Sequence, residues 1–229
     1  MMYPDHEVYR KLYANYLDRR PAAELVDLVD VDDGVVVDLC CGEGEITKLC
    51  LDRGADKVYM VDSEPRMIDV EYFRQGGYRV EILTMEVAIY LWNYCRSGLP
   101  PFADVVFCRQ AVNYWFASEM ADNLPCIIKP GGRFIFNTFN RKPSEKPTIK
   151  EYLHDGSHFV EVSWLVPNQG GSGIDFVHHV QIRDRMESHT TRFAWISPVE
   201  FHTRLREMGF SIKESVDGGA SIYVCTREK

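Results

Sequence analysis

The stretch VVVDLCCGEGEIT at residues 35–47 decides the fold class of this chain. Its consecutive valines indicate a short strand that is buried on both faces, as strands of a parallel sheet are. Gly42 and Gly44 then allow a tight turn in which the backbone can approach a ligand closely. A strand, a glycine loop and a helical pattern in this order predict the first unit of an α/β domain.

Further apolar runs follow, and the spacers between them are long enough for the crossover helices that parallel strands need. These runs are residues 58–61, 80–83, 105–108 and 134–139. The sequence KPGG at residues 129–132 is a turn signal in front of the last run. We therefore predict an α/β fold with a doubly wound, mostly parallel sheet.

A change in composition after residue 140 predicts an insertion. Residues 141–155 are rich in Lys, Pro, Ser and Glu, which is typical of an exposed loop. Residues 159–195 alternate apolar and polar side chains around a glycine-rich turn, which predicts two or three antiparallel strands. We expect residues 141–195 to form an inserted, antiparallel β-rich lid.

The last part of the chain returns to the α/β pattern. Ser197 and Glu200 match a capping box, which predicts the start of a helix. Two further strands are predicted at residues 210–216 and 221–226, on either side of a glycine turn. The sequence therefore predicts a single domain over residues 1–229, interrupted by the lid.

Composition limits the function classes. The net charge of −8 argues against a nucleic-acid partner, because phosphates demand a basic surface. Apolar runs stay well short of the roughly 18 residues that a membrane span needs. The seven cysteines are scattered and contain no C-x-x-C pair, which indicates free thiols and no zinc ribbon. We expect a cytoplasmic protein without metal, membrane or nucleic-acid partners.

The charges of the glycine loop bear on which ligand it takes. Asp62 ends the second apolar run, where an acidic side chain of a doubly wound fold accepts hydrogen bonds from ribose hydroxyls. A dinucleotide fingerprint would require glycine instead of Thr47. Asp38, Glu43 and Glu45 would repel a pyrophosphate, whereas the sulfonium and ammonium of S-adenosylmethionine suit them. An NAD-type oxidoreductase remains the alternative.

The chain resembles class I S-adenosylmethionine-dependent methyltransferases, particularly their small-molecule branch. The resemblance is carried by DLCCGEG at residues 38–44 together with VDSEPRMI at residues 61–68. FADVV at residues 102–106 resembles the fourth strand of that family, and KPGG its turn into the fifth. The resemblance covers residues 8–140 and 197–226. It implies a Rossmann-like, seven-stranded sheet and S-adenosylmethionine as the cofactor.

The resemblance also implies roles for individual residues. The implied cofactor-binding residues are Asp38, Cys40, Gly42, Gly44, Asp62, Ser63, Met67, Glu86, Val87 and Cys108. The family more often has glycine at Cys40, so this side chain must point away from the cofactor or the loop must shift. Glu86 can also be an exposed acid in a first helical turn, and Cys108 a small buried apolar residue.

Acceptor-binding candidates come from an N-terminal aromatic stripe and from the segment after the fourth strand. They are Tyr9, Tyr13, Arg109, Asn113, Tyr114 and Trp115. The stripe, on a helix predicted over residues 5–17, can instead pack on the core. Arg109 fits either an anionic acceptor or an ion pair with a neighbouring carboxylate.

A general base is needed only where the acceptor must lose a proton. The candidates are His178 and His179, which lie in an alternating stretch, so that at most one of them faces inward. Either can equally be an ordinary strand histidine.

We therefore predict transfer of a methyl group from S-adenosylmethionine to N or O of a small molecule by direct in-line displacement. Because no base is obvious in the sequence, a non-catalytic methyltransferase-like partner subunit is a second hypothesis. The sequence leaves a homodimer open.

Overall fold

The computed structural model of the chain describes residues 20–139, 146–154, 157–167, 174–182, 185–217 and 220–228. The described residues up to 139 and from 196 onward belong to one compact unit, and those from 146 to 195 belong to another. The helix predicted over residues 5–17 lies outside the described residues. In the described part of the chain, no helix has the length and hydropathy needed to cross a membrane.

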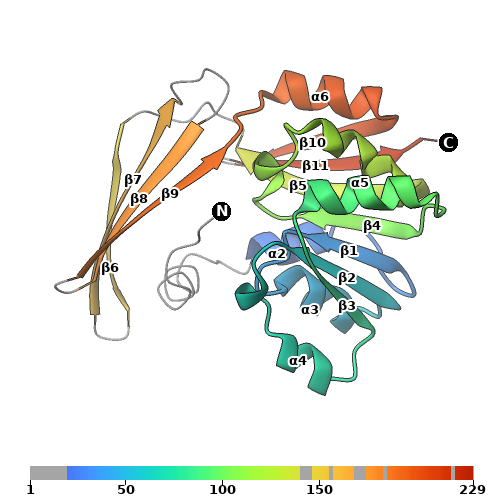
Figure 1. Cartoon of the computed structure of the whole chain (residues 1–229), viewed down its shortest axis with the longest axis horizontal. Helices are drawn as coiled ribbons and strands as arrows, with labels where there is room; N and C mark the ends of the chain where they lie inside the picture. Colours follow the sequence, from blue (N-terminus) through green and yellow to red (C-terminus); the bar gives the residue numbers. More distant parts are fainter. Residues whose placement is uncertain are drawn as a thin grey trace. The chain divides into compact units, whose positions relative to one another are not determined.

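The larger unit is built on a seven-stranded sheet with the order β10-β11-β5-β4-β1-β2-β3 (Figure 1). Its strands are β1 (Val35–Leu39), β2 (Lys57–Asp62), β3 (Val80–Thr84), β4 (Ala103–Cys108), β5 (Ile128–Phe139), β10 (Phe210–Asp217) and β11 (Ala220–Arg227). The pairs among β1 to β5 are all parallel, whereas β11 pairs antiparallel with both β5 and β10. The predicted mostly parallel, doubly wound sheet is confirmed.

Helices connect these strands on both faces of the sheet (Figure 1). The α-helices are α2 (Arg20–Val26), α3 (Glu45–Asp52), α4 (Val70–Gln75), α5 (Val87–Ser97) and α6 (Pro198–Glu207). The 3-10 helices are η1 (Pro65–Met67), η2 (Val112–Tyr114) and η3 (Glu119–Cys126). The chain leaves β1 toward β2 but reaches β4 on the other side of β1. Such a reversal leaves a crevice at the carboxyl ends of the two strands, where ligands of open α/β sheets bind.

Buried apolar side chains on both faces of the sheet form the core. Val36, Val58 and Phe107 come from three neighbouring strands and belong to one cluster of buried residues. On β5, the fully buried ring of Phe136 stacks on Tyr223 of β11, with ring centroids 4.7 Å apart. This packing holds the carboxyl ends of the strands in fixed positions, because close-packed interiors resist small displacements.

The predicted capping box at the start of α6 is confirmed. The backbone N–H of Glu200 donates to Oγ of Ser197 at 3.2 Å, and the N–H of Ser197 donates to the Glu200 carboxylate at 2.8 Å. These two bonds satisfy donors that the first helical turn would leave unpaired.

The second unit contains a four-stranded antiparallel sheet with the order β6-β7-β8-β9. Its strands are β6 (Thr148–His154), β7 (Ser157–Pro167), β8 (Ile174–Ile182) and β9 (Arg185–Phe193). Residues 148–154, predicted as part of a loop, instead pair with β7 along their whole length. Nearby Lys, Pro and Ser favoured the loop prediction, but Thr, Ile and Tyr within this segment have high strand propensity.

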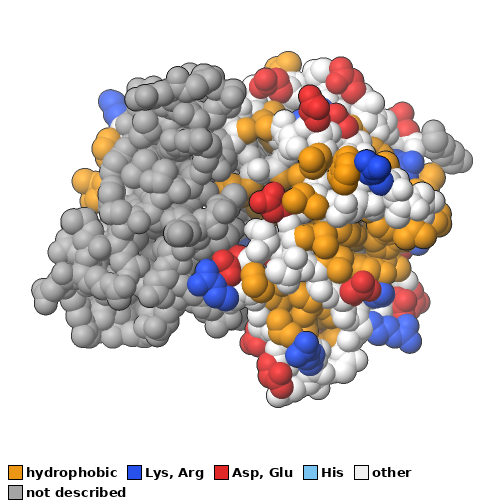
Figure 2. All heavy atoms as spheres, in the orientation of Figure 1, with side chains coloured by type: hydrophobic (Ala, Val, Ile, Leu, Met, Phe, Trp, Pro, Cys, Tyr) orange, Lys and Arg blue, Asp and Glu red, His pale blue; other side chains and the backbone are white. Residues whose placement is uncertain are grey.

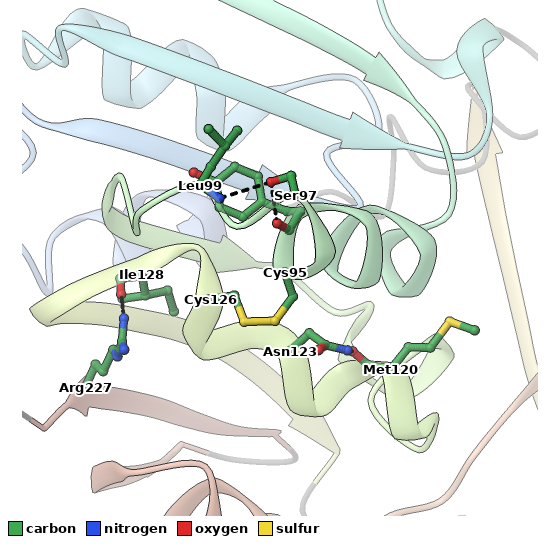
Figure 3. The surroundings of a disulfide bond; sticks show 9 residues. Cys95, Ser97, Leu99, Met120, Asn123, Cys126, Ile128 and Arg227 are labelled. Carbon is green, nitrogen blue, oxygen red and sulfur yellow. Dashed lines mark hydrogen bonds between the residues drawn. A yellow bond between two sulfur atoms is a disulfide. The ribbon is translucent and has the colours of Figure 1, made fainter.

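A disulfide joins Cys95 near the end of α5 to Cys126 at the end of η3, with Cα atoms 5.3 Å apart (Figure 3). The expectation of free thiols is therefore wrong for this pair. It holds for Cys40, Cys41, Cys50, Cys108 and Cys225. The two sulfurs meet because α5 and η3 pack together, and sequence spacing alone does not reveal such a contact.

Breaking this disulfide is expected to lower the free energy of unfolding by about 4 kcal/mol, because it closes a loop of 31 residues in the unfolded chain. Urea unfolding of the Cys95→Ala/Cys126→Ala double variant measures the loss. Dithiothreitol should destabilise the wild type to a similar extent and leave the double variant unchanged. A wild-type midpoint that does not respond to the reductant would contradict the prediction.

Candidate functional site

The glycine loop between β1 and α3 owes its shape to left-handed backbone at three positions. Cys40, Gly42 and Gly44 have φ values of 55°, 53° and 77°. A side chain at Gly42 would meet no atom within 4 Å, so the loop borders open space there. The Cys40 thiol instead hydrogen-bonds with Cys108 at the end of β4, and this bond together with burial raises the pKa of Cys40. The side chain that replaces the family's usual glycine thus lies against the neighbouring strand.

Asp38 near the end of β1 is buried, with 2% of its surface exposed. Its Oδ2 accepts hydrogen bonds from the backbone N–H and from Oγ1 of Thr47, at 3.2 and 2.8 Å. Burial raises the pKa of Asp38 to about 7, although the bonds from Thr47 and the charge of Arg109 act in the opposite direction. The first turn of α3 is thereby fixed to the end of β1 through a carboxyl that titrates near neutral pH.

Asp62 at the end of β2 holds the other side of the loop. Its Oδ2 accepts from the Gly42 backbone N–H at 2.9 Å, and its Oδ1 accepts from the Glu64 N–H at 2.9 Å. Burial raises the pKa of Asp62, while these backbone bonds oppose the shift. Each carboxylate oxygen has a second lone-pair direction, so Asp62 can accept further hydrogen bonds from a ligand.

The segment after β4 is held in place by contacts with two other elements. Arg109 forms an ion pair with Glu45, the first residue of α3, at 2.6 Å. Gln110 has a left-handed φ of 55°, and its backbone N–H donates to Oδ1 of Asn137 on β5 at 2.8 Å. Of the two interpretations of Arg109, the structure contains the ion pair.

Two further contacts fix the aromatic part of this segment. Nε1 of Trp115 donates to the sulfur of Cys108 at 3.4 Å, and Oγ1 of Thr138 donates to Oδ1 of Asn113. Asn113 and Trp115 are both buried, whereas Tyr114 between them is 39% exposed. Of these three acceptor candidates, Tyr114 is the most exposed side chain.

The remaining predicted site residues either follow β2 and β3 or lie outside the residues that the structure describes. Ser63 and Glu86 are exposed, and Glu86 is the N-cap residue of α5. Met67 and Val87 are buried. Tyr9 and Tyr13 lie outside the described residues, as do the side chains of His178 and His179 on β8. The assigned roles of all these residues stay predictions.

Sequence reasoning missed three contributors to the site. Thr47 was noted only because it breaks the dinucleotide fingerprint, yet it supplies both hydrogen bonds to Asp38. The backbone of Glu64, which donates to Asp62, had no signal in the sequence, and the side chain of Asn137 had only a weak one. An Asn near the end of a buried strand was the one available hint, because a buried amide needs partners.

The charges at this edge fit a nucleoside cofactor that carries positive charge and no phosphate. The Thr47 amide, which could bind a phosphate at the start of α3, is occupied by Asp38. The nearby basic side chains are engaged as well: Lys48 lies 4.5 Å from the Tyr72 ring centre, and Arg66 pairs with Glu64. Within the described ranges, no group of three or more His, Cys, Asp or Glu side chains could hold a metal ion.

The fold and this site define an α/β protein with a candidate nucleoside site at the carboxyl ends of β1 and β2. The chain matches the family model of the methyltransferase domain over residues 13–215 and belongs to that family. The predicted resemblance to class I methyltransferases is thereby confirmed.

Individual relatives are distant. The ubiquinone biosynthesis O-methyltransferase of Coxiella burnetii (strain Dugway 5J108-111) is 25% identical over 185 residues, covering 80% of this chain and 74% of the relative. The amino pentose methyltransferase CalS10 of Micromonospora echinaspora superposes with a TM-score of 0.76 at 18% identity, covering 99% of this chain and 98% of CalS10. The sugar N-methyltransferase KedS8 of Streptoalloteichus sp. ATCC 53650 gives 0.68 at 14% identity, covering 100% and 95%.

Proposed function

We propose that the chain transfers a methyl group from S-adenosylmethionine to a nitrogen or oxygen atom of a small molecule. The observation that carries the proposal is the Asp62 carboxylate, which is bonded to the Gly42 amide across the glycine loop and keeps acceptor capacity for ribose hydroxyls. Family membership supports a methyltransferase over an NAD-type oxidoreductase. The carboxylate of Asp38 on β1 also supports it, because it accepts the Thr47 N–H in the first turn of α3, where a pyrophosphate would otherwise bind.

When bound, the cofactor supplies a methyl group that is already activated on a sulfonium. The chain therefore has to orient two ligands and exclude water, which can account for much of the rate enhancement. Asp62 and the glycine loop hold the nucleoside, and Asp38 offers a negative charge to the methionine end. The segment from Cys108 to Trp115 forms the wall on the acceptor side, and residues 141–195 act as a lid.

Two groups of similar proteins bear on the identity of the methyl acceptor. The Coxiella relative is an O-methyltransferase of ubiquinone biosynthesis, while CalS10 and KedS8 act on sugars, KedS8 at nitrogen. Because their identities to this chain are low, we propose a small-molecule acceptor and leave the attacking atom to experiment. The exclusion of nucleic acid rests on the net charge of −8.

Calorimetric titration with S-adenosylmethionine tests the cofactor, and methyl transfer from radiolabelled cofactor to a panel of phenols and amino sugars tests the reaction. We expect binding and transfer to at least one member of the panel. Absence of binding to the wild type would overturn the proposal. Tight binding without transfer to any panel member would favour the non-catalytic partner subunit instead.

Replacing Asp62 with Ala is expected to weaken binding of S-adenosylmethionine at least about tenfold, because hydrogen bonds to a charged group contribute about 1.5–3 kcal/mol. The variant also loses the acceptor for the Gly42 amide. Calorimetry measures the affinity, and thermal unfolding checks the fold. The control is Asp56→Ala, which removes an exposed ion pair with Arg79 and should leave affinity unchanged. Equal affinity of Asp62→Ala and wild type would refute the assignment.

A homodimer stays a prediction. Figure 2 shows hydrophobic side chains exposed on the visible face of the larger unit. On α5, Ile89 and Trp92 are 42% and 39% exposed. Light scattering of the purified chain measures the mass in solution.

A further inference from the structure

The side-chain amide of Asn137, near the carboxyl end of β5, is buried but only half satisfied. The residue is 5% exposed, and its Oδ1 accepts the backbone N–H of Gln110 at 2.8 Å. Nδ2 donates no hydrogen bond to any residue that the structure describes. It is not one of the fully enclosed atoms without a partner in this part of the chain, so it keeps accessible surface. Because buried amides normally have partners for both ends, the two unused N–H donors point to a ligand.

The register of the sheet places Asn137 near the level of the glycine loop. Asp38 is paired with Phe107 of β4, and Phe107 is paired with Ile135 of β5. Asn137 therefore lies two residues beyond the level of Asp38, toward the carboxyl edge of the sheet. Val36 and Ile135 belong to one buried cluster, and each precedes by two residues one of the two polar side chains. Asp38 and Asn137 thus project from the same face of the sheet.

The strand order separates Asn137 from the candidate nucleoside site. β4 lies between β5 and β1, and β2 with Asp62 lies on the far side of β1. At about 4.8 Å per strand, β5 is about 10 Å from β1 and about 14 Å from β2. In a direct displacement the acceptor must lie next to the cofactor's sulfonium, beside the nucleoside and not on top of it. The end of β5 is on the side of the site that this second ligand would occupy.

The residue that holds the amide has an uncommon backbone conformation. Gln110 has a φ of 55°, in a region that residues other than glycine seldom adopt. Its bond to Asn137 supports this conformation, and backbone outliers of this kind cluster at ligand sites. Gln110 also lies within the segment that we assign to the acceptor side. The bond therefore fixes the orientation of the amide relative to that segment.

We propose that Asn137 determines acceptor specificity: its Nδ2 donates a hydrogen bond to a hydroxyl or carbonyl oxygen next to the methylated atom of the acceptor. This inference rests on the proposed function, because it needs a methyl acceptor at this edge. An amide does not take up a proton near neutral pH, so Asn137 binds and orients the acceptor and does not act as a base. An analogue without the oxygen is rejected, because it leaves a buried donor unpaired.

The test compares two pairs of acceptors that differ in one neighbouring hydroxyl: catechol with phenol, and 2-aminocyclohexanol with cyclohexylamine. Methyl transfer from radiolabelled S-adenosylmethionine to each acceptor gives kcat/KM, and calorimetry gives the affinity for the cofactor. We expect the wild type to prefer the hydroxyl-bearing member of a pair by about tenfold. Asn137→Ala should abolish this preference by lowering kcat/KM for that member alone, and its cofactor affinity should equal that of the wild type.

Asn137→Asp separates the unused donors from the contact with Gln110. Its carboxylate can still accept the Gln110 N–H but has no N–H to donate, so this variant should also lose the preference. Asn123→Ala is the matched control, because the Asn123 amide donates to the Met120 carbonyl at 2.8 Å within η3 (Figure 3). The control should keep the wild-type preference. Thermal unfolding shows whether each variant is folded.

An equal loss on both members of a pair, or a preference that survives in Asn137→Asp, would overturn the inference and leave Asn137 a structural residue. Weaker cofactor binding by Asn137→Ala would also overturn it, because the amide would then serve the cofactor. Absence of transfer to either hydroxyl-bearing acceptor, with normal cofactor binding, would overturn the inference alone. Failure of the wild type to bind S-adenosylmethionine would instead overturn the proposed function.

Discussion

Replacing Asp38 with Asn should make the protein more stable while it weakens S-adenosylmethionine binding by about 100-fold. Oδ1 of Asn can accept the two hydrogen bonds that Thr47 now donates to the carboxylate. The substitution therefore removes a buried charge without removing the contact that fixes α3. The cofactor, however, loses a charge-assisted partner, and such a bond contributes about 1.5–3 kcal/mol.

The gain in stability depends on pH, and its sign follows from the pKa of Asp38. The folded state raises this pKa from 3.8 to about 7, so the folded state holds the proton more tightly than the unfolded chain does. Wild-type stability therefore falls as the pH rises between these two values. At pH 8 we expect Asp38→Asn to gain about 1–3 kcal/mol, and below pH 4 we expect no gain.

Thermal unfolding at pH 4 and pH 8 measures the stability, and calorimetry at pH 8 measures the affinity. A gain of 1 kcal/mol corresponds to about 2–4 °C in a chain of this size. Asp56→Asn is a control, because this acid is exposed and pairs with the exposed Arg79. If Asp38→Asn proved less stable than the wild type at pH 8, the ionised carboxylate would be stabilising and this account would be wrong.

Replacing Phe136 with Ala should lower the free energy of unfolding by about 3–5 kcal/mol, as expected for a fully buried aromatic ring. Phe136 lies between Phe134 and Tyr223, with ring centroids 4.7 Å away in each case, and 5.5 Å from Phe201 of α6. Truncation leaves a cavity that joins three elements of the core. A domain with 5–15 kcal/mol of total stability would lose a large part of it.

Urea unfolding measures this loss. Phe136→Leu keeps much of the volume and should cost less than half as much. Leu99→Ala, at a side chain that is 59% exposed, should change stability by no more than about 0.5 kcal/mol. A loss below 1 kcal/mol in Phe136→Ala would show that the core around β5 collapses to fill the gap.

Local signals predicted most of the fold. Val35 to Val37, the glycine turn and the Ser197 capping box each depend on residues close in sequence, and the structure contains all of them. The loop predicted over residues 141–155 was wrong for residues 148–154, which form a strand. The Lys, Pro and Ser residues that indicated a loop lie mostly before this strand. Propensity within a short segment was the better guide there than the average over the region.

Long-range contacts could not be predicted in the same way. Asp62 was identified through its place at the end of a strand, but the Arg109–Glu45 pair and the bond from Gln110 to Asn137 join distant parts of the sequence. The Cys95–Cys126 disulfide is of the same kind, because only the packing of two helices brings its thiols together. A single sequence records which groups need partners but not which partners they find.

The position of β11, which is late in the sequence but lies next to β5 in the sheet, has a consequence for folding during synthesis. On the ribosome, β5 emerges well before its partner, since Phe139 at its end pairs with Ala220. Until the last strands are synthesised, one side of β5 carries unpaired N–H and C=O groups, the kind of edge along which chains associate. β11 therefore covers the open edge of β5 and also provides the strand with which β10 pairs. Chains that stop before β11 would leave the ribosome with that edge uncovered and would be prone to aggregation.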